Sequence, residues 1–167
     1  MSFFFNSSHP LRCSERYITL LRKTEKKKKE LCQSRGLLKI VKKIVFKYYY
    51  EKLFRLGQKY NLDIGLYSCD EGLKIWHNAG GIVINQNARI GKNLILHGCN
   101  CIGNDGINPK LAPKMGDNIH MGFGSCVIGD VSIADGIWIA AGAVVTTSFD
   151  EPNIVIGGVP ARKIKNL

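Results

Sequence analysis

Histidine is the side chain of this sequence best suited to proton transfer near neutral pH, and it occurs four times, as His9, His77, His97 and His120. An imidazole titrates in that range, so it can take the proton from a hydroxyl group that is to act as a nucleophile. His9 lies in residues 1–14, where Asn6-Ser7-Ser8 and Pro10 argue against a stable helix. We expect that stretch to be disordered and His9 to lie on the surface.

The six cysteines have no paired C-x-x-C spacing, and the chain is not a small secreted scaffold. Free thiols are therefore the expected state. The alternative is a zinc or redox pair formed by Cys99-x-Cys101.

The sequence has a six-residue period: an aliphatic residue returns every six positions from Ile84 to Val145, with one interruption. The structure that forms this repeat must position the histidines and cysteines that lie within it. A β-solenoid has this period, whereas a helix or a simple alternating strand does not. The positions two before each of them are mostly small or apolar, so two inward residues per hexad build one core. His120 occupies an outward position and is expected on the surface. The ten residues are Ile84, Ile90, Leu96, Ile102, Met115, Met121, Val127, Ile133, Ile139 and Val145.

The interruption is the segment from Gly103 to Lys114, where 13 residues separate Ile102 from Met115 and six would suffice. Its composition is that of a loop throughout. An inserted loop on a rigid solenoid is a place to expect function, and we assign Asp105 within it to substrate binding. His97 follows the core residue Leu96, so its ring should point outward from a coil close below this loop.

The positive charge is concentrated before the solenoid: residues 1–60 hold 16 Lys and Arg against 4 Asp and Glu, a net charge of +12. We predict a basic helical N-terminal segment over residues 1–60, broken near Ser34-Arg35-Gly36, and a solenoid domain over residues 61–167. The helices could lie on an anionic membrane, bind nucleic acid, or dock on the domain with their charges solvated. We expect no nucleic-acid partner.

No segment is apolar enough to span a membrane, because four lysines interrupt the run of apolar residues that starts at Leu37, and Phe3-Phe4-Phe5 is too short for a signal sequence. The expected location is the cytoplasm, with possible peripheral contact at the inner membrane face.

Six short segments carry a resemblance: Gly80–Asn85, Ala88–Gly91, Leu96–Gly98, Cys101–Asn104, Ala141–Thr146 and Gly158–Arg162. Together they resemble the hexapeptide-repeat acyltransferases, most closely the serine acetyltransferase-like branch that includes proteins encoded with surface-polysaccharide genes. The resemblance covers about residues 60–165. It implies a left-handed parallel β-helix, a homotrimer, and acetyl-CoA lying in a cleft between neighbouring copies. An acceptor hydroxyl would attack the thioester directly, without a metal or a covalent intermediate.

By this resemblance His77, ahead of the segment Gly81-Ile82-Val83, occupies the place of the family's catalytic histidine, with one extra residue before Ile82. Asp63, fourteen residues earlier, is the nearest equivalent of the aspartate that orients it, and Asp70 is the reserve. We assign His97 to catalysis or acceptor binding. The alternatives are structural packing for His77 and trimer packing for His97.

Related O-acetyltransferases imply the donor site: the small residue lets the pantetheine approach the backbone, and cations meet the phosphates. Thr147 stands where a lysine is usual. The residues are Ala141, Thr146, Thr147, Arg162 and Lys165.

The sequence departs from serine acetyltransferases where they hold serine: Trp76 replaces an aspartate, and Leu111-Ala112 replaces an Arg-His pair. A tryptophan beside the base suits the apolar face of a sugar. The prediction is therefore acetyl transfer to a sugar hydroxyl, with Trp76 binding the acceptor. The alternatives are L-serine O-acetylation, and a non-catalytic scaffold or metal-binding hexapeptide protein, which would need a closer histidine pairing than His77 and His97 offer.

Overall fold

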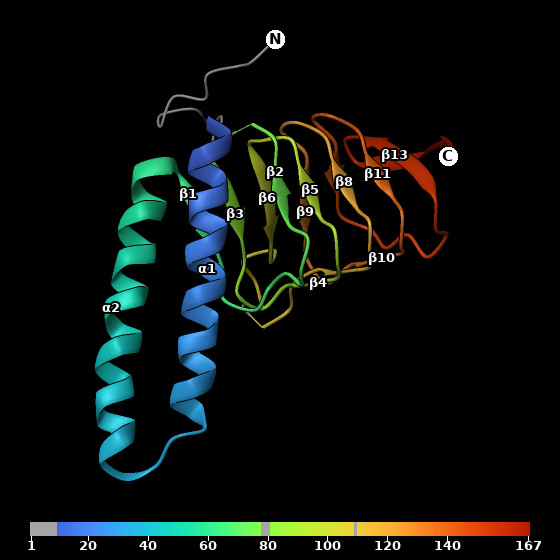
Figure 1. Cartoon of the computed structure of the whole chain (residues 1–167). Helices are drawn as coiled ribbons and strands as arrows, with labels where there is room; N and C mark the ends of the chain where they lie inside the picture. Colours follow the sequence, from blue (N-terminus) through green and yellow to red (C-terminus); the bar gives the residue numbers. More distant parts are fainter. Residues whose placement is uncertain (1–9, 78–80, 109) are drawn as a thin grey trace. The chain divides into compact units, whose positions relative to one another are not determined.

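The computed structural model describes residues 10–77, 81–108 and 110–167, and the chain divides into two compact units between Leu62 and Asp63. The first unit is a hairpin of two helices, α1 (Pro10–Cys32) and α2 (Gly36–Tyr60) (Figure 1). The break predicted near Ser34-Arg35-Gly36 is confirmed. No helix in the described ranges is both long enough and apolar enough to cross a bilayer.

The predicted disorder of residues 1–14 is wrong from Pro10 to Ser14, which are helical. Proline is tolerated in the first turn of a helix, where its missing N–H has no intrahelical partner to lose. His9 and the rest of residues 1–9 lie outside the described residues.

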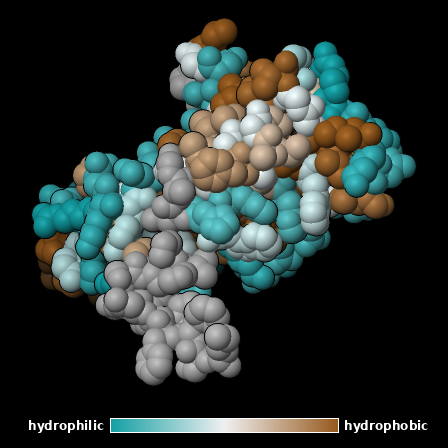
Figure 2. All heavy atoms as spheres, turned by 90° about the horizontal axis from the view of Figure 1, so that it is seen from above, coloured by the Kyte–Doolittle hydropathy of each residue, from teal (hydrophilic) through white to brown (hydrophobic). Residues whose placement is uncertain are grey.

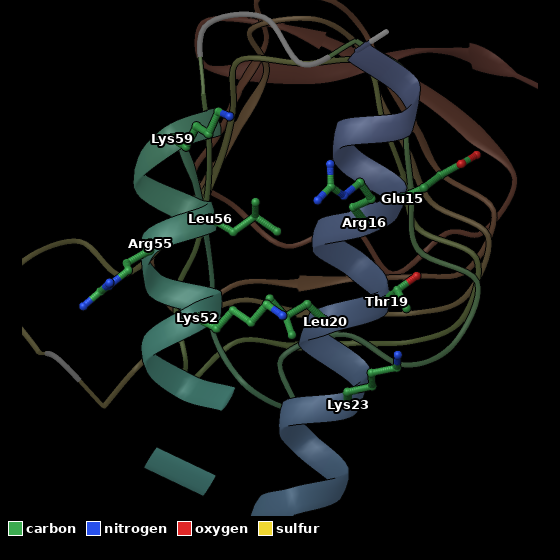
Figure 3. A pocket seen from close by; sticks show the side chains of 9 residues that line it. All are labelled: Glu15, Arg16, Thr19, Leu20, Lys23, Lys52, Arg55, Leu56 and Lys59. Atoms are coloured by element: carbon green, nitrogen blue, oxygen red, sulfur yellow. The ribbon is translucent and has the colours of Figure 1, made fainter. Parts of the chain in front are cut away.

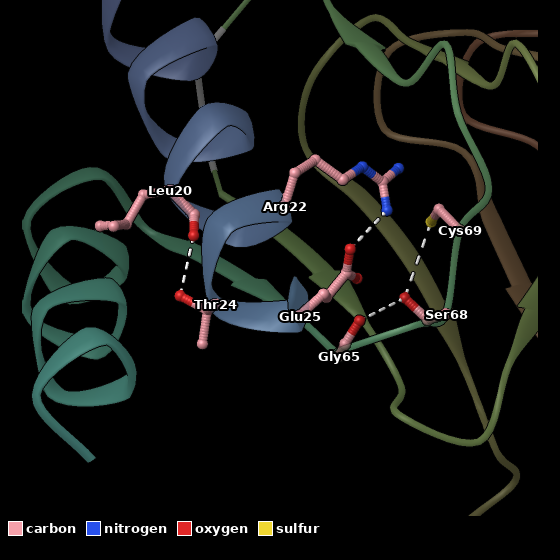
Figure 4. Close-up of polar contacts among 7 residues, drawn as sticks. All are labelled: Leu20, Arg22, Thr24, Glu25, Gly65, Ser68 and Cys69. Atoms are coloured by element: carbon pink, nitrogen blue, oxygen red, sulfur yellow. Dashed lines mark hydrogen bonds and ion pairs between the residues drawn. The ribbon is translucent and has the colours of Figure 1, made fainter. Parts of the chain in front are cut away.

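Local contacts organise the hairpin. The Thr24 hydroxyl donates to the Leu20 carbonyl oxygen at 2.8 Å within α1 (Figure 4). Leu53 and Gly57 are the buried residues of α2, and a Cβ built on Gly57 would lie 3.4 Å from the Tyr17 ring of α1. These contacts place the inner face of α2 against α1.

The second unit is built from three sheets, which we call A, B and C. Sheet A holds β1 (Leu62–Ile64), β3 (Ile82–Ile84), β6 (Asn100–Gly103), β9 (Cys126–Ile128) and β12 (Val144–Val145). Sheet B holds β4 (Arg89–Ile90), β7 (Lys114–Met115) and β10 (Ser132–Ile133). Sheet C holds β2 (Lys74–Ile75), β5 (Ile95–Leu96), β8 (His120–Met121), β11 (Trp138–Ile139), β13 (Ile154–Gly158) and β14 (Ala161–Asn166).

From β2 to β12 the chain passes through sheets C, A and B in turn. Each strand from β2 to β9 pairs in parallel with the strand three further along the chain, in the same sheet. This topology is a three-sided β-solenoid, and Figure 1 shows its successive coils side by side. All ten predicted hexad residues are buried, with exposures from 0% to 5%, and so are the seven predicted inward positions two before them. The predicted core is confirmed. The seven are Ala88, Leu94, Ile119, Ser125, Val131, Ile137 and Ala143.

The corner between sheets B and C repeats one left-handed residue per coil: Asn93, Asn118, Gly136 and Asn153, with φ from 56° to 67°. The Asp117 carboxylate accepts the Lys92 N–H of the coil before at 2.7 Å, and the Asp135 carboxylate accepts the Asp117 N–H at 2.8 Å. Asparagine and glycine tolerate this conformation, and the aspartates satisfy amides that the turn leaves unpaired.

The three outward faces differ in chemistry. On sheet B the outward side chains are Arg89, Lys114 and Ser132, all exposed. On sheet A they include Asp63 on the edge strand β1. From β3 to β12 the outward residues are Val83, Cys101, Cys126 and Val144, which stand in register on neighbouring strands. On sheet C they include Ile95, His120 and Trp138. Only the face of sheet B is an ordinary solvated surface.

Burial raises the pKa of the Cys101 thiol in the outward row of sheet A. Figure 2 shows hydrophobic and neutral side chains gathered in a band on the part of the solenoid visible there. All six cysteines are free thiols, as predicted.

The last strand reverses the pattern. β14 pairs antiparallel with β13, so it forms the end of sheet C. Lys163 on β14 forms an ion pair with Glu151 at 2.6 Å. At the other end, in the first irregular coil, the Ser68 hydroxyl donates to the Gly65 carbonyl oxygen at 2.7 Å (Figure 4).

Candidate active site

The corner between sheets C and A, which we call the C–A corner, is where the chain leaves β2, β5, β8 and β11 for β3, β6, β9 and β12. His77 lies in the first of these turns, two residues after β2, and its side chain is exposed. Residues 78–80 lie outside the described residues. They belong to the stretch between His77 and Ile82, which is one residue longer than in serine acetyltransferases by the resemblance. The turns after β5, β8 and β11 form the rest of this corner.

Trp76 and His97 stand together at the C–A corner. The Trp76 N–H donates to the Leu96 carbonyl oxygen at 2.9 Å, so Trp76 and His97 occupy matching positions in adjacent coils. Their ring centroids are 4.6 Å apart with planes inclined by 33°. Trp76 is 45% exposed, so one face of its ring stays open to a ligand. The sequence-predicted residues Trp76, His77 and His97 are thus brought to one edge.

A buried asparagine fixes the turn after His97. Asn100, 2% exposed, accepts the Gly98 N–H through Oδ1 at 2.9 Å and donates through Nδ2 to the Gly122 carbonyl oxygen at 2.8 Å and the Ser125 hydroxyl at 3.1 Å. These bonds tie two successive corner turns together. A histidine just before such a turn is held on rigid backbone, which favours a defined ring position.

His120 and Trp138 form a second stacked pair on the outward face of sheet C, with centroids 4.4 Å apart and planes inclined by 16°. The outward position predicted for His120 is confirmed, but its ring is only partly exposed because it lies against the indole. Burial, and to a smaller extent the nearby charge of His97, lower the pKa of His120. The sequence contained the signal: His120 and Trp138 are eighteen residues apart, which is three hexads, so one lies directly over the other.

We expect an NMR pH titration to give His120 a midpoint below the ordinary value of about 6.5. Trp138→Ala should raise that midpoint by returning the ring to water, and His97→Gln should raise it less by removing a neighbouring cation. Since the unfolded chain would bind this proton more readily, His120 supports stability above about pH 6.5 and loses that effect as the pH falls through its lowered pKa. A midpoint unchanged by both substitutions would contradict this account.

In the coils that follow His97, the residues at the matching position are small. Hydrogen bonds between coils place Gly122, Ala140 and Gly157 in line after His97. A Cβ added to Gly122 would lie 2.5 Å from the Ala141 backbone nitrogen, so no larger residue fits there. Arg162 on β14 pairs with Gly157 at the far end of this strip, and its side chain is exposed. At about 4.8 Å per coil, Ala141 stands about 14 Å from His77 along the corner.

The other predicted site residues lie elsewhere on the solenoid. Thr146 and Thr147 follow β12 at the corner between sheets A and B, and Lys165 pairs with Val155, two residues along β13 from the strip. Asp63 projects from β1 of sheet A. Within the described ranges no hydrogen bond or ion pair joins Asp63 to His77, so the orienting role of Asp63 stays a prediction.

The loop between β6 and β7 also leaves the corner between sheets A and B, not the corner that carries His97. Asp105 in this loop is exposed, and its carboxylate accepts the N–H groups of Ile107 at 2.9 Å and Asn108 at 3.2 Å. The Ile107 bond, and then the Asn108 bond, lower the pKa of Asp105. Within one chain, therefore, the loop and His97 leave the solenoid at different corners.

Comparison with known proteins relates the chain to acetyltransferases. It is 34% identical over 88 residues to a serine acetyltransferase of Mycobacterium tuberculosis, an alignment that covers 52% of this chain and 38% of that protein. It is 27% identical over 81 residues to a protein of Escherichia coli named putative colanic acid biosynthesis acetyltransferase WcaB, covering 48% of this chain and 50% of that protein. No family model matches.

Among solved structures, the serine acetyltransferase of Brucella abortus in complex with coenzyme A aligns with a TM-score of 0.63 and 24% identity, over 89% of this chain and 54% of that one. The fold is thus that of the serine acetyltransferases, and the resemblance read from the sequence is confirmed. The chain spans half or less of the length of the Mycobacterium tuberculosis and Escherichia coli relatives.

Proposed function

We propose that this chain is an O-acetyltransferase that uses acetyl-CoA as donor and acts on a hydroxyl group of a sugar in surface-polysaccharide synthesis. The observation that carries the proposal is the C–A corner, which aligns Trp76, His77 and His97 with a strip of small residues that ends at Arg162. In this proposal the solenoid is left-handed, as the resemblance implies. Acetyl transfer also agrees with the names of both sequence relatives.

His77 is the proposed general base. It would take the proton of the acceptor hydroxyl while that oxygen attacks the thioester carbon, so that a C–O bond forms and the C–S bond breaks. The thiolate of coenzyme A then leaves and recovers a proton. His97, held against Trp76, would orient the acceptor beside this base.

The strip of Gly122, Ala140 and Ala141 is the proposed track of the pantetheine arm, because residues this small would let a thin ligand lie close to the backbone. At the far end of the strip the Ile164 side chain lies close to Gly157. Arg162 at its end is positioned for a phosphate. The solved structure of the Brucella protein contains coenzyme A, which supports a donor of this kind. Thr146 and Thr147 would join this site from a neighbouring copy, whereas Lys165 would join it from the same chain, beside Arg162 on β14.

Two exposed indoles favour a sugar acceptor over serine. Trp76 and Trp138 are 45% and 47% exposed on the same sheet, each braced by an imidazole on one side. Aromatic faces of this kind stack on the apolar face of a pyranose, whereas an amino acid needs ionic partners. Trp76 and Leu111-Ala112 stand where serine acetyltransferases carry such partners. Serine is the second candidate, because the first relative is named for it.

A homotrimer would complete the site. An apolar row on sheet A borders the C–A corner and is formed by Val83, Cys101, Cys126 and Val144. A single chain leaves this row in contact with water, which favours packing against another copy. If sheet A of one copy packs beside the C–A corner of the next, the loop carrying Asp105 and the two threonines reach a shared cleft.

An acceptor screen with acetyl-CoA, followed by thiol release, tests the proposal. We expect turnover with nucleotide sugars or oligosaccharides and little with L-serine. Preference for L-serine would transfer the assignment to cysteine biosynthesis. No thiol release above the hydrolysis background with any hydroxyl acceptor would favour a non-catalytic scaffold.

A further inference from the structure

The outer face of α2 carries large apolar side chains in solvent. Leu37, Val41, Ile44 and Tyr48 follow one another at spacings of four, three and four residues, so they form one stripe. They are 83%, 57%, 67% and 62% exposed. Leu53 and Gly57, which are buried, lie on the opposite face of the helix. The stripe is therefore not the one that packs the hairpin.

The same stripe continues into cations. Lys52, Arg55 and Lys59 extend it at spacings of four, three and four residues after Tyr48. With Arg16 and Lys23 of α1 they line a groove of about 750 Å³ within the hairpin (Figure 3). Glu15 is the one carboxylate of this lining, and Arg55 also pairs with Glu51 at 3.2 Å. One face of α2 is thus apolar over its first half and cationic over its second.

From this face we infer a membrane-docking surface: α2 lies along an anionic phospholipid bilayer, with its apolar half at the level of the acyl boundary and its cationic half on the headgroup phosphates. Exposed apolar side chains beside lysines are the composition of interfacial helices. The net charge of +12 over residues 1–60 adds long-range attraction to such a surface.

Other occupants fit the face less well. In a parallel pair of α2 helices the cationic halves would meet, and in an antiparallel pair each apolar half would meet a cationic one. Nucleic acid would satisfy the cations and leave the apolar half in water. The bilayer matches both halves at once if α2 is tilted in the interface, because its apolar half then reaches the acyl boundary while its cationic half stays at the level of the phosphates. This surface is independent of the proposed acetyl transfer.

Vesicle flotation of the full chain tests the inference. We expect the protein to float with vesicles of phosphatidylcholine and phosphatidylglycerol, to float poorly with phosphatidylcholine alone, and to be released from the anionic vesicles by high salt. The double variant Val41→Ser/Ile44→Ser should reduce the bound fraction by about tenfold or more, and Lys52→Gln/Lys59→Gln should reduce it most at low salt.

The control is Ile164→Ser, which removes a side chain of comparable exposure, 59%, from β14 of the solenoid and should float like the wild type. Circular dichroism confirms that each variant is folded. Equal flotation with neutral vesicles, or no flotation at all, would overturn the inference. If the wild type fails to float while Val41→Ser/Ile44→Ser lowers the mass in light scattering, the face contacts another copy of the chain instead.

Discussion

Replacing His77 with alanine is expected to lower kcat by about two to four orders of magnitude, the usual loss when a general base is removed. Affinity for acetyl-CoA and the mass of the assembly should not change, because His77 is exposed at the end of β2 and packs no core. Steady-state kinetics on one acceptor, with coenzyme A binding measured by calorimetry, gives both quantities.

His97→Ala provides the matched comparison at the neighbouring position. If His97 orients the acceptor through its contact with Trp76, its loss should raise the acceptor KM more than it lowers kcat. Asp63→Asn should fall between the two. Near-normal turnover by His77→Ala together with lost turnover by His97→Ala would show that His97 is the base.

The second large effect concerns assembly. We expect light scattering to give about three times the chain mass of 18.6 kDa. Val83→Asp should dissociate the trimer, because it places one carboxylate of each copy in the apolar row of sheet A. Acetyl transfer should be lost with it, since the proposed cleft is shared. Val83 is 49% exposed in the single chain, so the change leaves the fold itself intact.

Ser132→Asp is the control for this experiment, because it adds the same charge to the outward face of sheet B. That variant should remain trimeric and active. A wild-type chain that is a stable and active monomer would refute both the trimer and the shared cleft.

The core could be predicted because burial in a solenoid depends only on local repetition. Ile84 and Ile102, eighteen residues apart, must enter the same sheet, and both are buried. The corner residues could be predicted for the same reason. Asparagine is one of the few residue types that tolerate positive φ, and Asn93 and Asn118 both adopt it.

The site was only partly predictable. The position of His97 after Leu96 and the replacement of an aspartate by Trp76 single out these two residues, yet their stacking depends on ring orientation, which no hexad count gives. The outward position of His120 follows from the hexad repeat, but the partial cover of its ring depends on how the Trp138 ring lies against it. The prediction of disorder from Pro10 to Ser14 treats proline as a helix breaker. Proline is also suited to the first turn of a helix, and α1 begins at Pro10.

The antiparallel strand β14 has a consequence for solubility. A stack of parallel coils ends in open strand edges, which can template the addition of another chain and so the growth of fibres. β14 covers the end of sheet C, and it presents Arg162, Lys163 and Lys165 outward. Sheets A and B end at this side in strands of two residues each, β12 and β10. The solenoid is thereby protected from end-to-end polymerisation by a charged cap at the longest of its exposed edges.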